Sequence, residues 1–138
     1  MVSNLTPSEI VSKMMENDAF SQWLGIKVIA VSLDCVTLEM TIRQTMVNGL
    51  SIAHGGITYA FGDSCMAFSA NSGGHKRVSI ETSISHKLPL KVDDVISATS
   101  KLTAQNNKTK SYEVLITNSE KKVVAIFKGE AYNTRKIW

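Results

Sequence analysis

Alternating apolar and polar side chains mark several extended segments of this chain. The clearest is residues 36–42, where apolar side chains occupy every even position and polar ones the odd positions between them, as expected of a strand with one buried face. Similar patterns predict strands at residues 26–31, 77–88, 95–104, 111–118 and 123–132. Because short polar connections join the later strands, we expect an antiparallel sheet.

Helix signals precede the first strand. Thr6 is a suitable N-cap, Pro7 fits the first helical position and Glu9 completes a capping box. This helix should end near Glu16, and a second short helix is expected over residues 18–24.

The main helix is predicted at residues 56–71, and its 16 residues would span roughly 24 Å. Its side chains are apolar or small on nearly every side, with one ionisable carboxylate and no basic residue. Such a helix belongs inside a protein. The order of elements therefore predicts one α+β domain, residues 1–138, in which a twisted antiparallel sheet of five to six strands wraps around one long central helix.

The net charge of +3 is unevenly distributed. Residues 1–100 carry 7 Lys and Arg against 9 Asp and Glu, which gives −2, and residues 101–138 carry 8 against 3, which gives +5. The basic C-terminal part is either a solvated face or a surface that attracts a polyanionic small molecule. Nucleic acid is disfavoured as a partner, because no dense basic run with interleaved aromatic residues is present.

The sequence also predicts a cytoplasmic protein without a membrane partner or a metal site. No apolar run approaches the ~20 residues that cross a bilayer, and residues 1–7 do not resemble a signal peptide. Cys35 and Cys65 lie in apolar surroundings and are expected to be buried, reduced thiols. The three histidines and two cysteines lack the spacing of metal ligands.

Asp63 is the residue that stands out chemically. A lone carboxylate in an apolar helix loses hydration unless it is paired, solvated in a cleft or protonated. One interpretation is structural, with the carboxylate capping a backbone N–H or facing solvent. The other is a pocket carboxylate whose pKa is raised by partial burial, which makes it a stronger base; we favour this interpretation.

The sequence His54-Gly55-Gly56 stands where the main helix begins. Paired glycines leave room for a ligand against the backbone, and N–H groups at a helix N-terminus stabilise developing negative charge. A simple structural turn is the alternative. His54 could be a metal ligand, a general base or a group that orients others by hydrogen bonding, and the last role is favoured.

The spacing of Gly55 and Asp63 predicts a dimer. Eight residues along one helix correspond to ~12 Å along its axis, whereas donors and bases act within about 3 Å of the reacting atoms. If both residues act on one substrate, they come from different chains, through two antiparallel copies of the helix. We therefore expect an isologous dimer with two sites at its interface.

Residues 48–67 read N-G-L-S-I-A-H-G-G-I-T-Y-A-F-G-D-S-C-M-A. The succession of N-G, H-G-G, an aromatic residue at Tyr59, a small residue with Asp63, and N-S at residues 71–72 resembles the hot-dog thioesterases of the phenylacetate-degradation (PaaI-like) type. Residues 15–18, 24–26 and 127–132 also match this family. The resemblance covers nearly the whole chain and is specific in the helix region.

The resemblance implies a hot-dog fold and hydrolysis of an acyl-CoA thioester to the free acid and CoA. Asp63 would activate water or attack the thioester directly, the Gly55 N–H would polarise the carbonyl, and His54 and Asn17 would position the carbonyl and water. Asn48 and Gly56 would contact the substrate. Relatives of this type are commonly dimers paired into tetramers and need no metal or redox cofactor.

Residues for the two ends of the substrate can also be predicted. The acyl pocket is expected to use Tyr59, Phe61, Met66 and the segment 45–52. For the CoA phosphates the candidates are basic residues near strand ends, foremost Lys87 and Lys128, and in addition Lys91, Lys110 and Arg135.

The sequence departs from the family pattern at two places, and the preferred acyl group is left open. Gly62 stands where Ala is usual, which should loosen the helix beside Asp63 by up to ~1 kcal/mol. His86-Lys87-Leu88 precedes Pro89 where Phe, Leu and Arg are frequent.

Two other functions remain open. A hot-dog hydratase or dehydratase would need a His opposite the helix carboxylate, and His86 could serve in principle. A non-catalytic acyl-CoA-binding module is the other alternative, although such a module has no need of a buried carboxylate at position 63.

Overall fold

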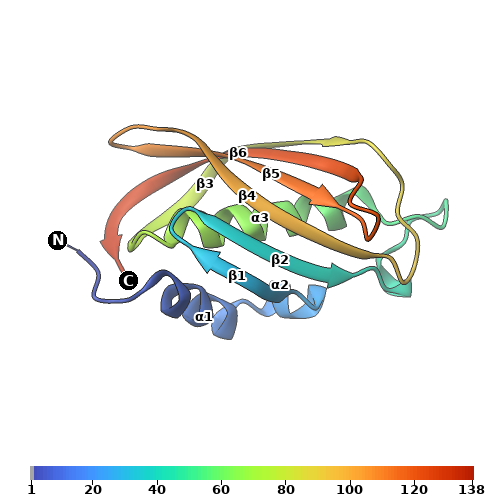
Figure 1. Ribbon diagram of the computed structural model, residues 1–138, viewed down its shortest axis with the longest axis horizontal. Coiled ribbons are helices and arrows are strands. Elements are labelled where there is room, and N and C mark those ends of the chain that lie inside the picture. The colour runs from blue at the N-terminus through green and yellow to red at the C-terminus, as the bar shows by residue number, and fades with distance from the viewer. Residues whose placement is uncertain (1) are drawn as a thin grey trace.

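The computed structural model describes residues 2–138, which form a strongly curved sheet around one long helix (Figure 1). The elements in chain order are α1 (Pro7–Asn17), α2 (Ala19–Leu24), β1 (Lys27–Ser32), β2 (Cys35–Thr41), a 3₁₀ turn (Gln44–Met46), α3 (Gly55–Asn71), β3 (His75–His86), β4 (Val95–Gln105), β5 (Thr109–Thr117) and β6 (Val123–Ile137).

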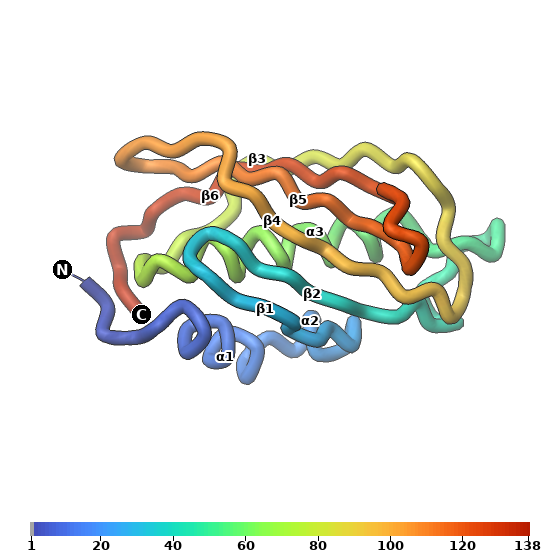
Figure 2. The backbone as a smooth tube through the Cα atoms, in the orientation of Figure 1, coloured from blue at the N-terminus to red at the C-terminus, as the bar shows by residue number. Residues whose placement is uncertain are grey.

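The six strands form one antiparallel sheet in the order β1-β2-β4-β5-β6-β3. The backbone trace shows the sheet passing over α3, which runs along its concave side (Figure 2). In β2, β4 and β5 every other side chain along the central part of the strand is buried on the face toward this helix, as the alternation in β2 predicts. The predicted α+β arrangement of five to six strands around one central helix is confirmed.

Element boundaries differ from prediction mainly where long-range pairing extends a strand. β6 continues to Ile137, five residues beyond its predicted end, because its last residues pair with the start of β3 (His75 with Ile137). Those residues are mostly polar, so their pattern gave no strand signal. The helix α3 begins at Gly55, one residue earlier than expected.

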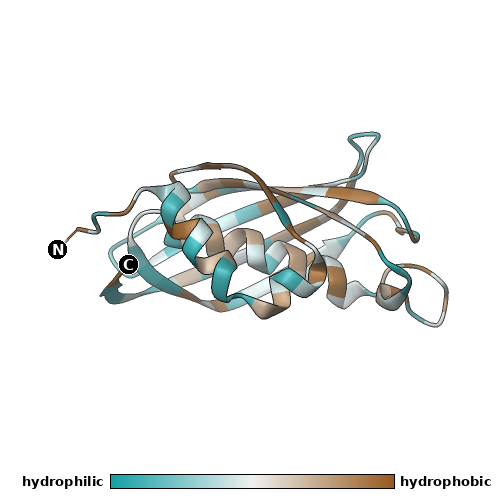
Figure 3. Ribbon diagram, turned by 90° about the horizontal axis from the view of Figure 1, so that it is seen from below, coloured by the Kyte–Doolittle hydropathy of each residue, from teal (hydrophilic) through white to brown (hydrophobic). Residues whose placement is uncertain are grey.

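The N-terminal helices form as their capping signals predict. The Thr6 hydroxyl accepts a hydrogen bond from the Glu9 N–H (3.2 Å), and the Glu9 carboxylate accepts one from the Thr6 N–H (3.0 Å), which lowers the pKa of Glu9. Both helices lie on the underside of the molecule in Figure 1, and Figure 3 shows apolar and polar positions interspersed along them. No helix in residues 2–138 is long and apolar enough to cross a membrane.

Gly62 has a packing role that its helix propensity does not reveal. A Cβ added at this position would lie 2.7 Å from the Cβ and Cγ of Phe127 on β6. The absence of a side chain therefore lets the sheet approach the helix in the turn that carries Asp63. The prediction that Gly62 merely loosens the helix missed this contact.

Replacing Gly62 with Ala should consequently destabilise the protein although Ala is the better helix former. We expect the free energy of unfolding to fall by up to about 2 kcal/mol, because overpacking costs about 1–3 kcal/mol and helix propensity returns about 1 kcal/mol. Urea denaturation would measure the change. Gly49→Ala is the matched control, since a Cβ there meets no atom within 4 Å, and a Gly62→Ala variant as stable as wild type would contradict the packing role.

The two cysteines have different environments. Cys65 is buried and its thiol donates to the Val36 carbonyl (3.3 Å), and burial raises its pKa to about 12. Cys35 is exposed, so the expectation that both thiols are buried was wrong for this one. The reason is the strand period: Val36 faces the core, and Cys35 is on the opposite face of β2. Neither thiol forms a disulfide.

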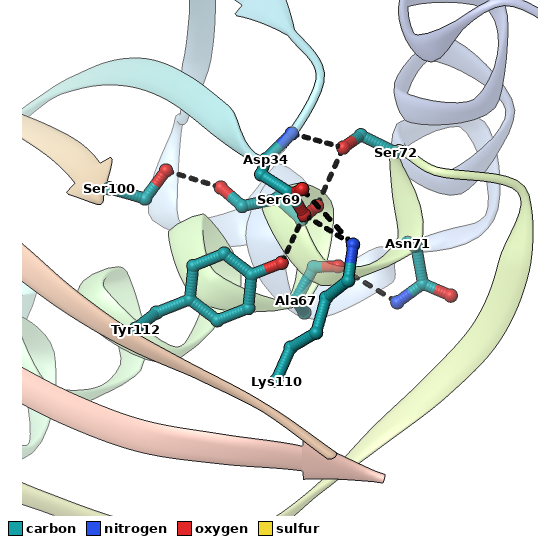
Figure 4. A network of polar contacts seen from close by, with 8 residues as sticks. All are labelled: Asp34, Ala67, Ser69, Asn71, Ser72, Ser100, Lys110 and Tyr112. Atoms are coloured by element: carbon teal, nitrogen blue, oxygen red, sulfur yellow. Dashed lines mark hydrogen bonds and ion pairs between the residues drawn. The ribbon is translucent and has the colours of Figure 1, made fainter. Parts of the chain in front are cut away.

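The C-terminal end of α3 is fixed by a polar network (Figure 4). Asp34, in the turn between β1 and β2, accepts from the Lys110 ammonium (2.9 and 3.0 Å) and the Tyr112 hydroxyl (2.5 Å), and its N–H donates to the Ser72 hydroxyl at the helix end (2.8 Å). Burial and the Asp34 carboxylate raise the pKa of Tyr112. Only 13% of the Lys110 side chain is exposed, so it is committed to Asp34, contrary to its candidacy as a CoA phosphate ligand.

Candidate active site

The segment before α3 is folded by one asparagine. The Asn48 side-chain oxygen accepts from the Leu50 N–H (2.9 Å), and its backbone N–H donates to the Ile52 carbonyl (2.8 Å). Such local hydrogen bonds are typical of Asn in turns. The turn returns the chain to the 3₁₀ segment, where the His54 N–H donates to the Met46 carbonyl (2.8 Å). Asn48 thus has a structural task besides the predicted contact with substrate.

His54 is the N-cap of α3. Its Nδ1 accepts a hydrogen bond from the Gly56 N–H (2.9 Å), which places the proton of the neutral ring on Nε2. His54 is exposed, and its role in orienting groups at the site stays a prediction. Because the Gly56 N–H is engaged by His54, it is not free for substrate.

The Gly55 N–H is the free donor at this end of the helix. Within residues 2–138 it forms no hydrogen bond, whereas the neighbouring N–H groups of His54, Gly56 and Ile57 all have partners. As the first residue of a 17-residue helix, Gly55 presents its N–H at the positive end of the helix dipole. The position is suited to binding an oxygen that gains negative charge.

Asp63 lies two turns further along α3 and is half-buried. Its Oδ1 is buried without a hydrogen-bond partner in the part of the chain that the structure describes. Burial raises the pKa of this carboxyl. A buried oxygen with no partner is uncommon in folded proteins, and Asp63 Oδ1 lacks the hydrogen bond that such an oxygen normally has.

Three predicted residues meet in a cavity of about 330 Å³ at the start of α3. Asn48, Gly55 and Lys87 line it, together with Thr58 and His86. The remaining walls are apolar and come from the segments 52–53 and 88–90. A concave, mostly apolar site with a few polar groups is typical of small-molecule binding.

Other predicted residues lie elsewhere. Phe61 and Met66 are fully buried in the core of the chain and reach no hollow. Tyr59 is half-buried, bonds through its hydroxyl to Thr82, and packs its ring edge-on against Phe127 at 5.5 Å. Of these three residues predicted for the acyl pocket, Tyr59 alone lies near enough to the surface of α3 to contact a substrate.

Lys128 and Asn17 are also separate from the cavity. Lys128 lies in a different hollow on the sheet, of about 390 Å³, with its Nζ 4.0 Å from the Glu113 carboxylate. The exposed Asn17 side chain donates to the Lys13 carbonyl within its own helix (3.1 Å). Neither the predicted contact of Lys128 with CoA nor the positioning role of Asn17 follows from these contacts within one chain.

His86 and Thr58 belong to the site more closely than the sequence indicated. A Cβ added at Gly55 would lie 3.3 Å from the His86 Nε2, so the ring packs directly against the first residue of the helix. Thr58 donates its hydroxyl hydrogen to the Gly55 carbonyl (3.1 Å). Thr58 was missed, because a threonine one turn into a helix carries no signal of its own.

Asp63 and Gly55 of one chain are too far apart to act on the same substrate, because about 12 Å separates them along α3. Each is nevertheless unsatisfied by the chain's own contacts, one as an acceptor and the other as a donor. No group of three or more His, Cys, Asp or Glu side chains in residues 2–138 could hold a metal ion.

A model of the family described as the thioesterase superfamily matches residues 50–125. The acyl-coenzyme A thioesterase PaaI of Escherichia coli (strain K12) is 32% identical over 119 residues, which cover 86% of this chain and 85% of the relative. A putative esterase of Archaeoglobus fulgidus is 27% identical over 123 residues, which cover 89% of this chain and 80% of the relative.

Two solved structures are also similar to this chain. The E. coli PaaI protein from the phenylacetic acid degradation operon superposes with a TM-score of 0.92 at 29% identity, covering 95% of each chain. The smu.793 protein of Streptococcus mutans UA159, solved bound to acetyl CoA, has a TM-score of 0.79 at 21% identity, covering 82% of this chain and 91% of that one, and shows the fold alone.

Proposed function

This chain belongs to the thioesterase superfamily, has the hot-dog fold and is a thioester hydrolase, and we propose that it hydrolyses an acyl-CoA to the free acid and coenzyme A. The observation that carries this proposal is the Asp63 carboxylate, half-buried, with a raised pKa and one oxygen without a partner. A raised pKa makes a carboxylate a better proton acceptor at neutral pH.

In the proposed reaction, Asp63 removes a proton from a water molecule as the water oxygen attacks the thioester carbonyl carbon. The carbonyl oxygen becomes an oxyanion and accepts a hydrogen bond from the Gly55 N–H. When the tetrahedral intermediate collapses, the C–S bond breaks and CoA leaves as its thiolate, which is then protonated as Asp63 gives up its proton. The alternative is direct attack by Asp63 on the carbonyl carbon. CoA then leaves as its thiolate, and water hydrolyses the resulting anhydride to the free acid.

The remaining site residues support these two groups. His54 holds the Gly56 N–H and thereby fixes the first turn of the helix. Asn17 is proposed to position the attacking water, as the resemblance implies. The proposed hydrolysis requires no metal or redox cofactor.

The reacting groups are proposed to come from two chains. The long strand β3 is at one edge of the sheet, and its Val78 and Ile80 are 55% and 56% exposed. An exposed edge strand with apolar residues is a template for pairing with another chain, and β3 packs next to α3. A second copy on this edge would bring two α3 helices side by side, with Gly55 of one chain near Asp63 of the other.

Lys87 is the basic residue proposed to attract the CoA phosphates, because it lines the cavity at Gly55. Lys128 is a secondary candidate from the separate hollow on the sheet. The cytoplasmic location and the pairing of two dimers into a tetramer stay predictions.

The activity can be tested with a panel of aryl, short-chain and medium-chain acyl-CoA esters, by following release of free thiol. Hydrolysis of at least one ester is expected. A folded protein that releases no thiol from any of them would overturn the proposal. Enoyl-CoA and β-hydroxyacyl-CoA belong in the panel because His86 lies beside the site, and their interconversion without thiol release would identify a hydratase instead.

The two-chain site can be tested by subunit mixing. Gly55→Pro, which removes the N–H, and Asp63→Asn should each inactivate a homodimer. A mixed dimer, isolated with two different tags, has one intact site of two and should regain about half of the wild-type activity.

The control for this experiment places both substitutions on the same chain. A chain carrying both Gly55→Pro and Asp63→Asn, paired with a wild-type chain, should be inactive, because each site then lacks one group. If the two groups act within one chain, the results reverse: the first mixture is inactive and the second keeps about half of the activity.

A further inference from the structure

His86 is the last residue of β3 and lines the cavity beside the helix N-terminus. Its place is fixed by the backbone, since the next residue, Lys87, donates its N–H to the Val124 carbonyl (2.8 Å). The ring Nε2 lies 3.3 Å from the position of a Cβ on Gly55. The imidazole therefore stands next to the unpartnered N–H of Gly55.

The contacts of Thr58 favour one position for the proton of the neutral His86 ring. The single hydroxyl hydrogen of Thr58 goes to the Gly55 carbonyl (3.1 Å), so the hydroxyl can only accept from His86 Nδ1, 3.4 Å away. The neutral ring is then protonated at Nδ1, and Nε2 carries a lone pair. When the ring gains a second proton, Nε2–H becomes a cationic donor beside Gly55.

We propose that protonated His86 is a second hydrogen-bond donor to the reacting thioester, acting through Nε2–H beside the Gly55 N–H. This role rests on the proposed hydrolysis of acyl-CoA. A cationic donor stabilises a developing oxyanion more strongly than a neutral one, so it contributes most in the transition state. The proton stays on the ring throughout, and His86 therefore adds no covalent step.

The charged groups around His86 set how the effect depends on pH. Lys87 follows it on β3, and His54 is on the adjoining helix start. Its register partner on β6, Ala125, carries no charge. The proposed donor is the cationic form of the ring, the form that low pH favours for any imidazole.

The test compares wild type with His86→Phe and His86→Gln. A phenyl ring fills the space against Gly55 without donating, and kcat/KM should fall by about 100-fold at pH values where an imidazole is charged. The ratio of wild type to variant should shrink as pH rises, because wild type loses the same donor. The Gln variant keeps a neutral donor and should lie between the two, with a ratio to the Phe variant that does not depend on pH.

Two further measurements make the outcome decisive. His75→Phe, at the other end of β3, should leave both kcat/KM and the pH profile unchanged. Nitrogen-15 NMR of the free protein should show neutral His86 protonated at Nδ1. A ratio near one at every pH, a ratio that does not vary with pH, or a neutral ring protonated at Nε2 would overturn the role of His86. Wild type without activity on any thioester would instead overturn the proposed function.

Discussion

Replacing Asp63 with Asn should lower kcat/KM for acyl-CoA hydrolysis by about 10²–10⁴-fold, the range that acid–base groups contribute. The amide has the same shape as the carboxylate but can neither take a proton from water nor attack a carbonyl. Initial rates of thiol release over a range of acyl-CoA concentrations give this ratio. Equal rates in both proteins would remove Asp63 from the mechanism.

The same substitution should not damage the fold, which separates a catalytic loss from an unfolded protein. Burial raises the pKa of Asp63 above its ordinary value, so the folded state binds this proton more tightly than the unfolded state does. The resulting stability is fully present at low pH and is lost as pH rises through the raised pKa. Asp63→Asn lacks this loss.

Urea denaturation of both proteins at about pH 4 and about pH 7 checks the linkage. The variant should gain stability relative to wild type on going from the lower to the higher pH. If the difference between the two proteins is the same at both values, the carboxylate is not perturbed by burial.

Replacing Gly55 with Pro should reduce kcat/KM by about 10²–10³-fold, the effect of removing one oxyanion donor. Proline is favoured at the first position of a helix. The backbone is prepared for it, because His54 has φ −60° and ψ 138°, which suits a residue before proline. The substitution therefore removes the free N–H while the helix is retained.

Gly55→Ala is the matched control for the proline variant. Both substitutions place a Cβ 3.3 Å from His86, but only Ala keeps the N–H. The Ala variant should retain much more activity than the Pro variant, and circular dichroism should show the same helix content in both. Equal losses would assign the effect to crowding of His86 rather than to the N–H.

The sequence was most informative where chemistry and local pattern coincide. A single carboxylate within an apolar helix and a Gly pair at its start are visible without any knowledge of the sheet, and the structure leaves one oxygen of Asp63 and the N–H of Gly55 unpartnered. The capping box at Thr6 is equally local. Each of these features depends on residues within a few positions of one another.

Contacts between distant segments could not be predicted in this way. The packing of Gly62 on Phe127 and of Gly55 on His86 depends on the register of β3 and β6 and on how they cross the helix. An α3 that is apolar all round also gives no period from which to choose its buried side. Phe61 was therefore predicted to line a pocket, whereas it is in the core.

The network around Asp34 fixes α3 at the end opposite to the candidate site (Figure 4). The helix has 17 residues and is about 25 Å long, so a small tilt at one end displaces the other end. A tilt of about 2° at Ser72 displaces the Gly55 end by about 1 Å, and an error of that size in the position of a reacting group can cost about 100-fold in rate. The ion pair of Asp34 with Lys110 thereby contributes to the position of the Gly55 N–H, which neither residue touches.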